Sequence, residues 1–84
     1  MENSTKKYQC PCCDYYTLSE KAGNTFQLCP VCFWEDDGVQ LNDTTYTGGA
    51  NELSLQESRL NFKKYGYSDE NFKNLVRVPS EEEL

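Results

Sequence analysis

Two cysteine motifs contain the residues of this chain whose types and spacing could do chemistry. The first is Cys10-Pro11-Cys12-Cys13, the second is Cys29-Pro30-Val31-Cys32, and 15 residues separate Cys13 from Cys29. The outer sulfurs of a Cys-x-x-Cys turn can reach one ion, and an interval of this length lets a hairpin bring two such turns together. The spacing therefore predicts a tetrahedral metal site with the ligands Cys10, Cys13, Cys29 and Cys32.

Zinc, as one ion per chain, is the metal that this ligand set favours. Iron is the alternative, because sulfur ligation alone does not separate the two metals. Disulfide bonds are a further use of clustered cysteines, but the chain has five, which leaves one unpaired. In a reducing compartment, paired Cys-x-x-Cys motifs indicate metal binding instead.

Catalysis at this metal is not expected. A catalytic zinc keeps an open position for water and usually has histidine or carboxylate ligands, whereas this chain contains no histidine. The commonest general base and any Cys–His nucleophilic pair are thereby missing as well. The interpretation is a structural site in a protein that is not an enzyme.

Cys12 lies within the first motif but outside its Cys-x-x-Cys pair. On the structural interpretation, which we favour, it is a small side chain that fills the tip of the turn. On the functional interpretation it is a redox thiol, which replaces a ligand or forms a disulfide on oxidation and so releases the metal.

Length and composition favour a single domain. The chain has 84 residues, of which 37% are hydrophobic, so the core is thin and a bound metal would be needed to hold the fold. We expect one domain over residues 1–84, with loosely ordered tails at 1–7 and 79–84.

The net charge of −6 argues against generic binding to nucleic acid or to an anionic membrane. Five cations in the second half of the chain could still bind a nucleic acid if all of them shared one face of the protein. They do not all share one, because Lys64 points about 100° away from Lys63 on a helix. The polar start of the chain predicts neither a signal peptide nor a membrane span, and a cytoplasmic location follows as the expectation. The five cations are Arg59, Lys63, Lys64, Lys73 and Arg77.

Residues 8–34 are expected to form a zinc ribbon. The β-prone stretches are 15–19 and 25–28, and the residues between them have the composition of a turn. The position after each Cys-x-x-Cys turn commonly needs positive φ, which Asp14 tolerates and which carries an energetic cost at Phe33. The second turn is therefore predicted to differ from the first.

The rest of the chain reads as a loop followed by a helix. Residues 35–51 lack periodicity and are predicted to be a long loop, whereas 54–65 carries strong helix signals: a capping box at Ser54 and Glu57, and Gly66 at the end. A short helix over 68–74 and an extended segment at 75–78 follow. The fold class is thus a small α+β domain. The side chains expected to anchor the loop are Val39, Leu41 and Tyr46; those expected to share the buried helix face are Leu55, Phe62 and Tyr65, with Tyr67 folding back onto Phe62.

An aromatic residue and three acids follow the second motif directly. Trp34 is either part of the core, which we favour, or the anchor of a protein-docking surface. Glu35, Asp36 and Asp37 are either solvated charges or the exposed rim of that surface.

These motifs together resemble the cysteine-rich CPCC family of small bacterial proteins. The resemblance rests on Cys10 to Tyr15, on Cys29 to Gln40, on Gly48 to Asn51 leading into Leu53 to Leu55, and on Asn61-Phe62, and covers about residues 7–70. It implies a zinc-binding module of bacterial origin and brings no known activity.

The function expected from these observations is a zinc-stabilised module that binds another protein. Two alternatives stay open: a nucleic-acid-associated zinc ribbon, and a redox switch that uses Cys12 and the metal site.

Overall fold

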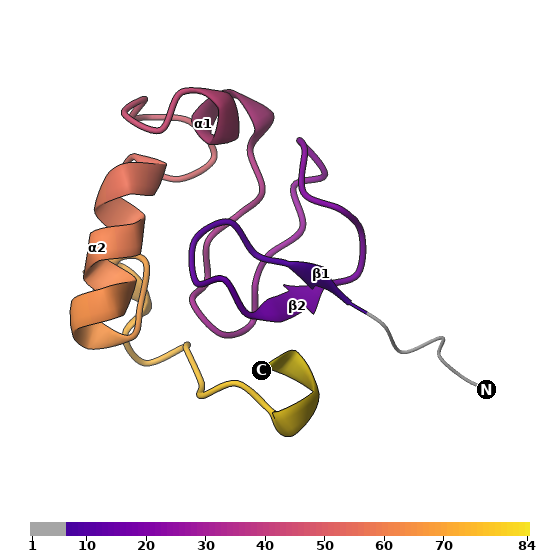
Figure 1. The fold of residues 1–84 in the computed structure, drawn as a ribbon. Helices are drawn as coiled ribbons and strands as arrows, with labels where there is room; N and C mark the ends of the chain where they lie inside the picture. Colours follow the sequence, from indigo (N-terminus) through magenta and orange to yellow (C-terminus); the bar gives the residue numbers. More distant parts are fainter. Residues whose placement is uncertain (1–6) are drawn as a thin grey trace.

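Short elements joined by ordered turns make up the chain (Figure 1). The computed structural model describes residues 7–84, so most of the predicted N-terminal tail at 1–7 lies outside the described residues. The architecture is a small α+β fold, which confirms the predicted class. The described elements are β1 (Tyr8–Gln9), β2 (Tyr16–Leu18), α1 (Gly38–Asn42), α2 (Leu55–Tyr65) and the 3-10 helices η1 (Glu70–Phe72) and η2 (Glu81–Glu83).

The first cysteine motif lies at the tip of a hairpin. Strands β1 and β2 flank it and pair antiparallel, with Tyr8 opposite Leu18. The strand predicted over 15–19 is confirmed, but the pairing partner is Tyr8–Gln9, which precedes the motif and is too short to give a sequence signal.

The second motif lies at the tip of a looser hairpin. The N–H of Phe26 donates to the carbonyl of Asp36 (2.9 Å), and an isolated bridge joins Leu28 to Glu35. The strand predicted over 25–28 is therefore wrong as a regular element. The segment still runs antiparallel to the residues after Cys32, and these contacts place the second pair of cysteines.

Both motifs turn in the same way. The N–H of Cys10 donates to the carbonyl of Tyr15 and the N–H of Cys29 donates to that of Trp34, at 2.9 and 3.0 Å. Asp14 and Phe33 both have φ of 68°. The prediction that the second turn differs is wrong. The cost of positive φ at Phe33 is offset by its packing, because its ring lies 5.5 Å from that of Phe72.

The segment 35–51 contains a helix that the sequence pattern did not indicate. Asp37 caps α1 by accepting a hydrogen bond from the N–H of Val39. Val39 and Tyr46 are exposed, so they do not anchor the segment as predicted, whereas Leu41 does pack against the core. The main anchor is Gln40, which is fully buried and whose side-chain amide donates to the carbonyls of Tyr46, Asn51 and Leu53.

Helix α2 begins and ends where the sequence predicted. Ser54 and Glu57 form the capping box, and Gly66 has φ of 88° at the C-terminal end. Leu55 is fully buried, and the ring of Phe62 packs edge-on against Tyr15. Tyr65 is exposed, so it does not belong to the buried face as predicted. Its ring stacks on that of Tyr67, and this contact replaces the one predicted between Tyr67 and Phe62. Among the described residues, no helix has both the length and the apolar character needed to cross a membrane.

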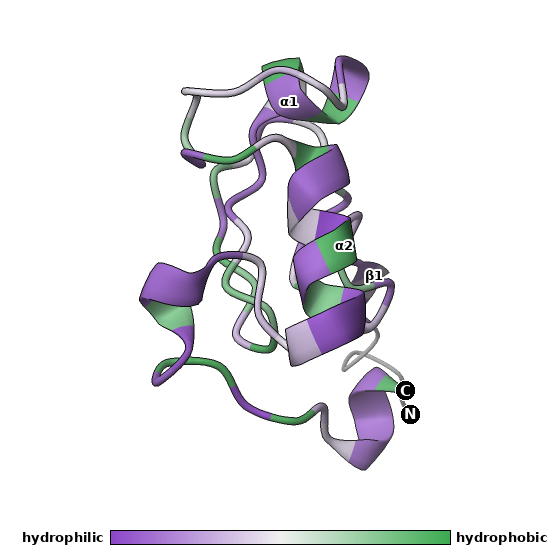
Figure 2. Cartoon of the chain, turned by 90° about the vertical axis from the view of Figure 1, so that its left-hand side faces the viewer, coloured by the Kyte–Doolittle hydropathy of each residue, from purple (hydrophilic) through white to green (hydrophobic). Residues whose placement is uncertain are grey.

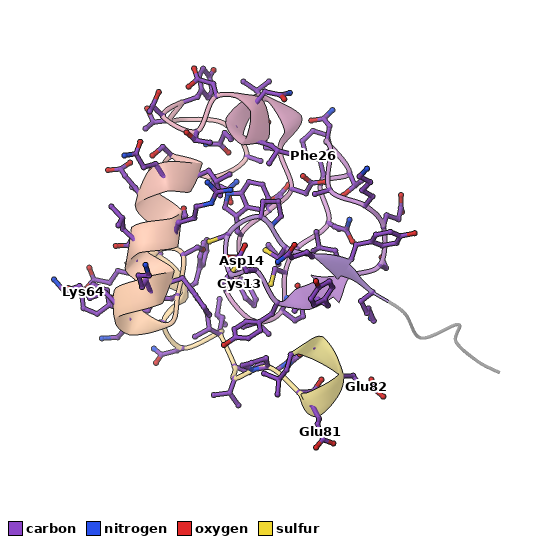
Figure 3. The ribbon with its side chains drawn as sticks, in the orientation of Figure 1. Cys13, Asp14, Phe26, Lys64, Glu81 and Glu82 are labelled. Atoms are coloured by element: carbon purple, nitrogen blue, oxygen red, sulfur yellow. The ribbon has the colours of Figure 1, made fainter. Side chains whose placement is uncertain are left out.

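The C-terminal segment folds back beside the first hairpin, where η2 contacts β2 (Figure 1). Asp69 caps η1, so the short helix predicted over 68–74 is present in shortened form. The prediction of a loose tail at 79–84 is wrong for Glu83, which is buried and pairs with Arg77 through two hydrogen bonds of 2.8 Å. Glu81 and Glu82 point away from the body of the molecule (Figure 3).

Candidate metal centre

The two hairpin tips bring the sulfurs of Cys10, Cys13, Cys29 and Cys32 together. The four sulfurs lie within 4.8 Å of one another, and both the Cys10–Cys32 and the Cys13–Cys29 pairs are 3.7 Å apart. All four residues are buried, and the sulfur atoms gather in the middle of the molecule near Cys13 (Figure 3). The structure thus places every predicted ligand in one cluster.

The dimensions of this cluster fit a tetrahedral ion. Zinc binds thiolate sulfur at about 2.3 Å, which corresponds to about 3.8 Å between two sulfurs of a regular tetrahedron. The observed 3.7 Å agrees with this edge length. Four thiolates at the corners complete the coordination of a zinc or iron ion and leave no position for water.

Four buried thiols at this separation cannot all ionise unless a cation neutralises them. Contacts with Cys13 and then Cys29 raise the pKa of Cys10, and the contact with Cys10 raises the pKa of Cys32. Cys29 is the exception, because hydrogen bonds from Cys10, Cys13 and Cys32 lower its pKa. Metal binding at this site is therefore coupled to the release of thiol protons.

Two further groups contact the sulfur of Cys29. The hydroxyl of Thr17, from β2, lies 3.0 Å from this Sγ, and the N–H of Cys32 donates to it at 3.5 Å. Such donors stabilise a thiolate and orient it toward a metal. Sequence reasoning missed Thr17; the signal available was its inward position in a strand that follows the first motif.

A model of the family described as "Cysteine-rich CPCC" matches residues 8–83. The match spans both hairpins, α2 and the C-terminal segment. The chain belongs to the cysteine-rich CPCC family. The resemblance inferred from the motifs is confirmed, and the CPCC match continues beyond residue 70, where the motifs end. No curated protein matches the chain in a sequence comparison.

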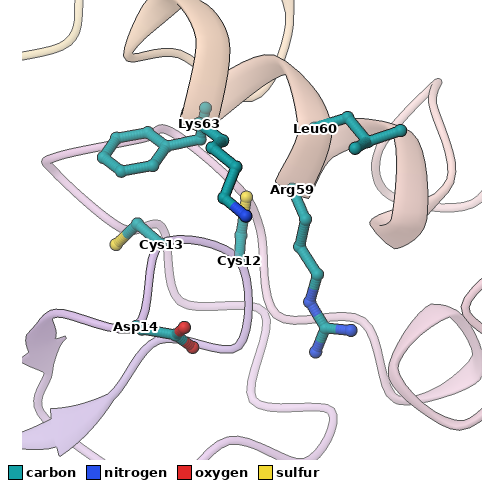
Figure 4. A pocket seen from close by; sticks show the side chains of 7 residues that line it. Cys12, Cys13, Asp14, Arg59, Leu60 and Lys63 are labelled. Carbon is teal, nitrogen blue, oxygen red and sulfur yellow. The ribbon is translucent and has the colours of Figure 1, made fainter.

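Cys12, the remaining cysteine of the CPCC motif, stands apart from the four clustered sulfurs. It is 5% exposed and borders a hollow between the first hairpin and α2, whose other side carries Arg59 and Lys63 (Figure 4). Its thiol is still close enough to Cys32 to contribute to the raised pKa of that residue, after the larger effect of Cys10.

Most of the residues from Trp34 to Asp37, for which a docking surface was the alternative interpretation, are buried. Trp34 is fully buried, in agreement with the core interpretation, and Asp36 and Asp37 are buried as well. Only Glu35 is partly exposed.

The two buried acids organise the backbone. Burial alone raises the pKa of Asp36, but hydrogen bonds from the hydroxyl and N–H of Thr25 and from Gly23 outweigh it, so the pKa is lowered. The N–H of Ala50 lowers the pKa of Asp37. Both carboxylates accept hydrogen bonds that fix the turns around the second cysteine motif, which explains why they are turned inward.

Proposed function

We propose that this CPCC protein is a non-catalytic module that binds one zinc ion through Cys10, Cys13, Cys29 and Cys32, and that it acts by binding another protein. The observation that carries the metal assignment is the buried tetrahedron of four sulfurs. The structural role of zinc follows from its closed coordination, since a reaction at the ion would require a ligand to leave.

Thiolate ligation suits a reducing compartment, and we propose the cytoplasm. There the cysteines stay reduced and available to the metal. Zinc is preferred to iron because it needs no redox partner and is the usual ion of small modules with four cysteine ligands.

Binding to a protein is supported by the surface of the chain. Among the described residues, several large apolar side chains are about half exposed or more, and exposed apolar side chains that lie together are typical of protein interaction sites. The net charge of −6 disfavours a nucleic acid as the main partner. The exposed apolar side chains include Leu60, Tyr65, Leu75, Val78 and Leu84.

Purification of the protein from its own cells, without added metal, tests the proposal. We expect one zinc per chain by elemental analysis and co-purification of a protein that is lost with the Cys13→Ser variant. Stoichiometric iron would contradict the zinc assignment. Recovery of DNA or RNA, with binding that weakens steeply as salt is raised, would favour the nucleic-acid ribbon instead.

A redox switch is the second candidate function, and the burial of Cys12 in the same core cluster as the four metal ligands favours it. Hydrogen peroxide would accept two electrons from the thiols of Cys12 and of one ligand cysteine, forming their disulfide and water, and the metal would lose that ligand. The test is zinc release by peroxide, followed with a chromogenic chelator. A switch requires release at low peroxide that Cys12→Ser abolishes; equal release from both proteins would contradict it.

A further inference from the structure

The hollow beside Cys12 is formed by two parts of the chain that are distant in sequence. Cys12, Cys13 and Asp14 come from the first hairpin, and the facing residues come from α2 (Figure 4). Its volume is about 360 Å³. The N–H at Nε of Arg59 donates to the carbonyl of Pro11 at 2.8 Å, which fixes the distance between the two walls.

The charge of this face is opposite to that of the molecule. No acidic residue occurs between Glu57 and Asp69, whereas Arg59, Lys63 and Lys64 lie in that interval, although the net charge of the chain is −6. Within residues 7–84, neither Arg59 nor Lys63 forms an ion pair. Asp14 is the one acid that lines the hollow, and it lies on the hairpin side.

Exposed apolar side chains lie beside these cations. Leu60, which lines the hollow, is 62% exposed, and Tyr65, which lines the next depression along α2, is 56% exposed. A second, more open depression lies along α2 and shares Leu60 and Lys63 with the first, so the two are adjacent, and together they are called the groove below. Figure 2, viewed from the side of α2, shows hydrophobic residues interleaved with hydrophilic ones along this helix.

We propose that this groove binds a short acidic segment of a partner protein, one whose carboxylates pair with Arg59 and Lys63 while an apolar side chain packs on Leu60. The inference rests on the proposed protein-binding function and assigns a surface and a partner chemistry to it. Charge complementarity selects the occupant, because a cationic pair beside exposed apolar side chains matches alternating acidic and apolar residues.

A nucleic acid fits the groove less well than an acidic peptide does. Arg77, which would extend the basic surface, is already paired with Glu83. A phosphate backbone carries charge along its whole length and would meet the acidic remainder of the protein, whereas a short peptide contacts only the groove between the first hairpin and α2.

Selection from a display library of short random peptides on the zinc-loaded protein tests the proposal. We expect enrichment of sequences with Asp or Glu beside Leu, Ile or Phe, and NMR shift changes for the strongest peptide at Cys12, Leu60 and Lys63. Raising salt from about 50 to about 500 mM should weaken its binding several-fold, since the charges are solvent-exposed.

Charge and apolar variants localise the site. Lys63→Glu and Leu60→Asp should each weaken the selected peptide at least about tenfold, while Lys73→Glu, the same charge change away from the groove, should have little effect. Both variants change exposed side chains, and zinc content checks their folding. Enrichment of neutral or basic peptides, or equal binding by Lys63→Glu, would overturn the inference.

The wider function is separable from the groove. If Leu60→Asp and Lys63→Glu still co-purify the cellular partner of the wild type, the protein binds through another surface and only this inference fails. If no peptide is enriched and no partner co-purifies, the protein-binding function fails as well. Binding of RNA or DNA that Lys63→Glu abolishes would assign the groove to nucleic acid and overturn the proposal.

Discussion

The side-chain hydroxyl of Thr17 lies within hydrogen-bond distance of the ligand sulfur of Cys29, at 3.0 Å. Thr17→Val keeps the shape of the side chain and removes only the hydrogen bond. We expect the variant to fold but to lose zinc about tenfold faster to a competing chelator, because groups that donate hydrogen bonds to a metal ligand contribute to metal affinity. The control is Thr45→Val, the same change at an exposed position. Equal rates of zinc loss in wild type and Thr17→Val would show that the contact does not support the ligand.

The roles of the adjacent thiols Cys12 and Cys13 can be separated by serine substitution. Cys13→Ser removes one of the four clustered sulfurs and should release the metal and unfold the domain, whereas Cys12→Ser should keep both. Zinc stoichiometry and circular dichroism provide the measurement. Loss of zinc from Cys12→Ser, with retention by Cys13→Ser, would reassign the ligand on this side of the site.

Residue spacing predicted the metal cluster but not its surroundings. Cys-x-x-Cys turns are local, so Cys10 and Cys13 could be assigned from sequence alone, and the 15-residue interval allowed for their partners. The sequence indicates surface charges at Asp36 and Asp37, because their hydrogen-bond donors, Thr25 and Ala50, are distant in sequence. Burial of a polar residue depends on such tertiary contacts, and no local pattern encodes them.

At the scale of elements, the segment after the second hairpin depends on Gln40. The side chain is fully buried, its Nε2 donates to three carbonyls, and its Oε1 accepts from the Asn51 side chain at 2.8 Å. Gln40→Leu should lower the free energy of unfolding by about 3 kcal/mol or more, because several buried carbonyls lose their donors. Gln56→Leu, the same change at an exposed position of α2, should change it by less than about 0.5 kcal/mol. Urea unfolding of the zinc-loaded proteins measures both, and similar values would contradict the anchoring role.

The contrast between α1 and α2 shows which elements a sequence can predict. Helix α2 has a capping box, an apolar face and a terminal glycine, all within 13 residues, and its limits were predicted correctly. Helix α1 has five residues, and its N-terminal cap, Asp37, also accepts a hydrogen bond from the N–H of Ala50. Strand β1 has two residues. Elements this short are specified by their tertiary partners, so periodicity cannot reveal them.

The C-terminal element η2 contains the carboxylate with the clearest shift. Hydrogen bonds from Arg77 lower the pKa of Glu83 to about 2 from its ordinary 4.5. Because the folded pKa is depressed, the stabilisation from this pair is present above pH 4.5 and is lost as the pH falls toward 2. Carbon-13 NMR of the zinc-loaded protein should show Glu83 still ionised below pH 4.5, down to the lowest pH at which the fold persists.

Arg77→Gln is the matched variant for this titration. Without the guanidinium, the midpoint of Glu83 should return toward 4.5, the ordinary value of the carboxyl group. Protonation of Glu83 near pH 4.5 in the wild type would contradict the pairing and would restore the interpretation of a loosely held tail.

At the scale of the whole molecule, the hydrophobic core and the metal site are the same structure. The buried hydrophobic residues of the described chain comprise all five cysteines and only four others. The backbone carbonyl of Cys32 also accepts a hydrogen bond from the N–H of Ser68 at 3.0 Å, which connects the segment after α2 to the second hairpin. The four other residues are Leu18, Val31, Trp34 and Leu55.

This composition makes folding depend on the ion. Zinc in small thiolate sites contributes about 10–16 kcal/mol of apparent binding energy, which equals or exceeds the whole stability of an ordinary small domain, about 5–15 kcal/mol. Four buried side chains cannot replace that contribution. Removing the metal with a strong chelator at neutral pH, in the presence of a thiol reductant, should therefore unfold the entire chain and not only the hairpin tips. Circular dichroism should lose the signal of α2 in step with zinc release, and readdition of zinc should restore it. If α2 persists after the metal is gone, its packing against Tyr15 and its own capping box hold it independently, and the site stabilises only the two hairpins.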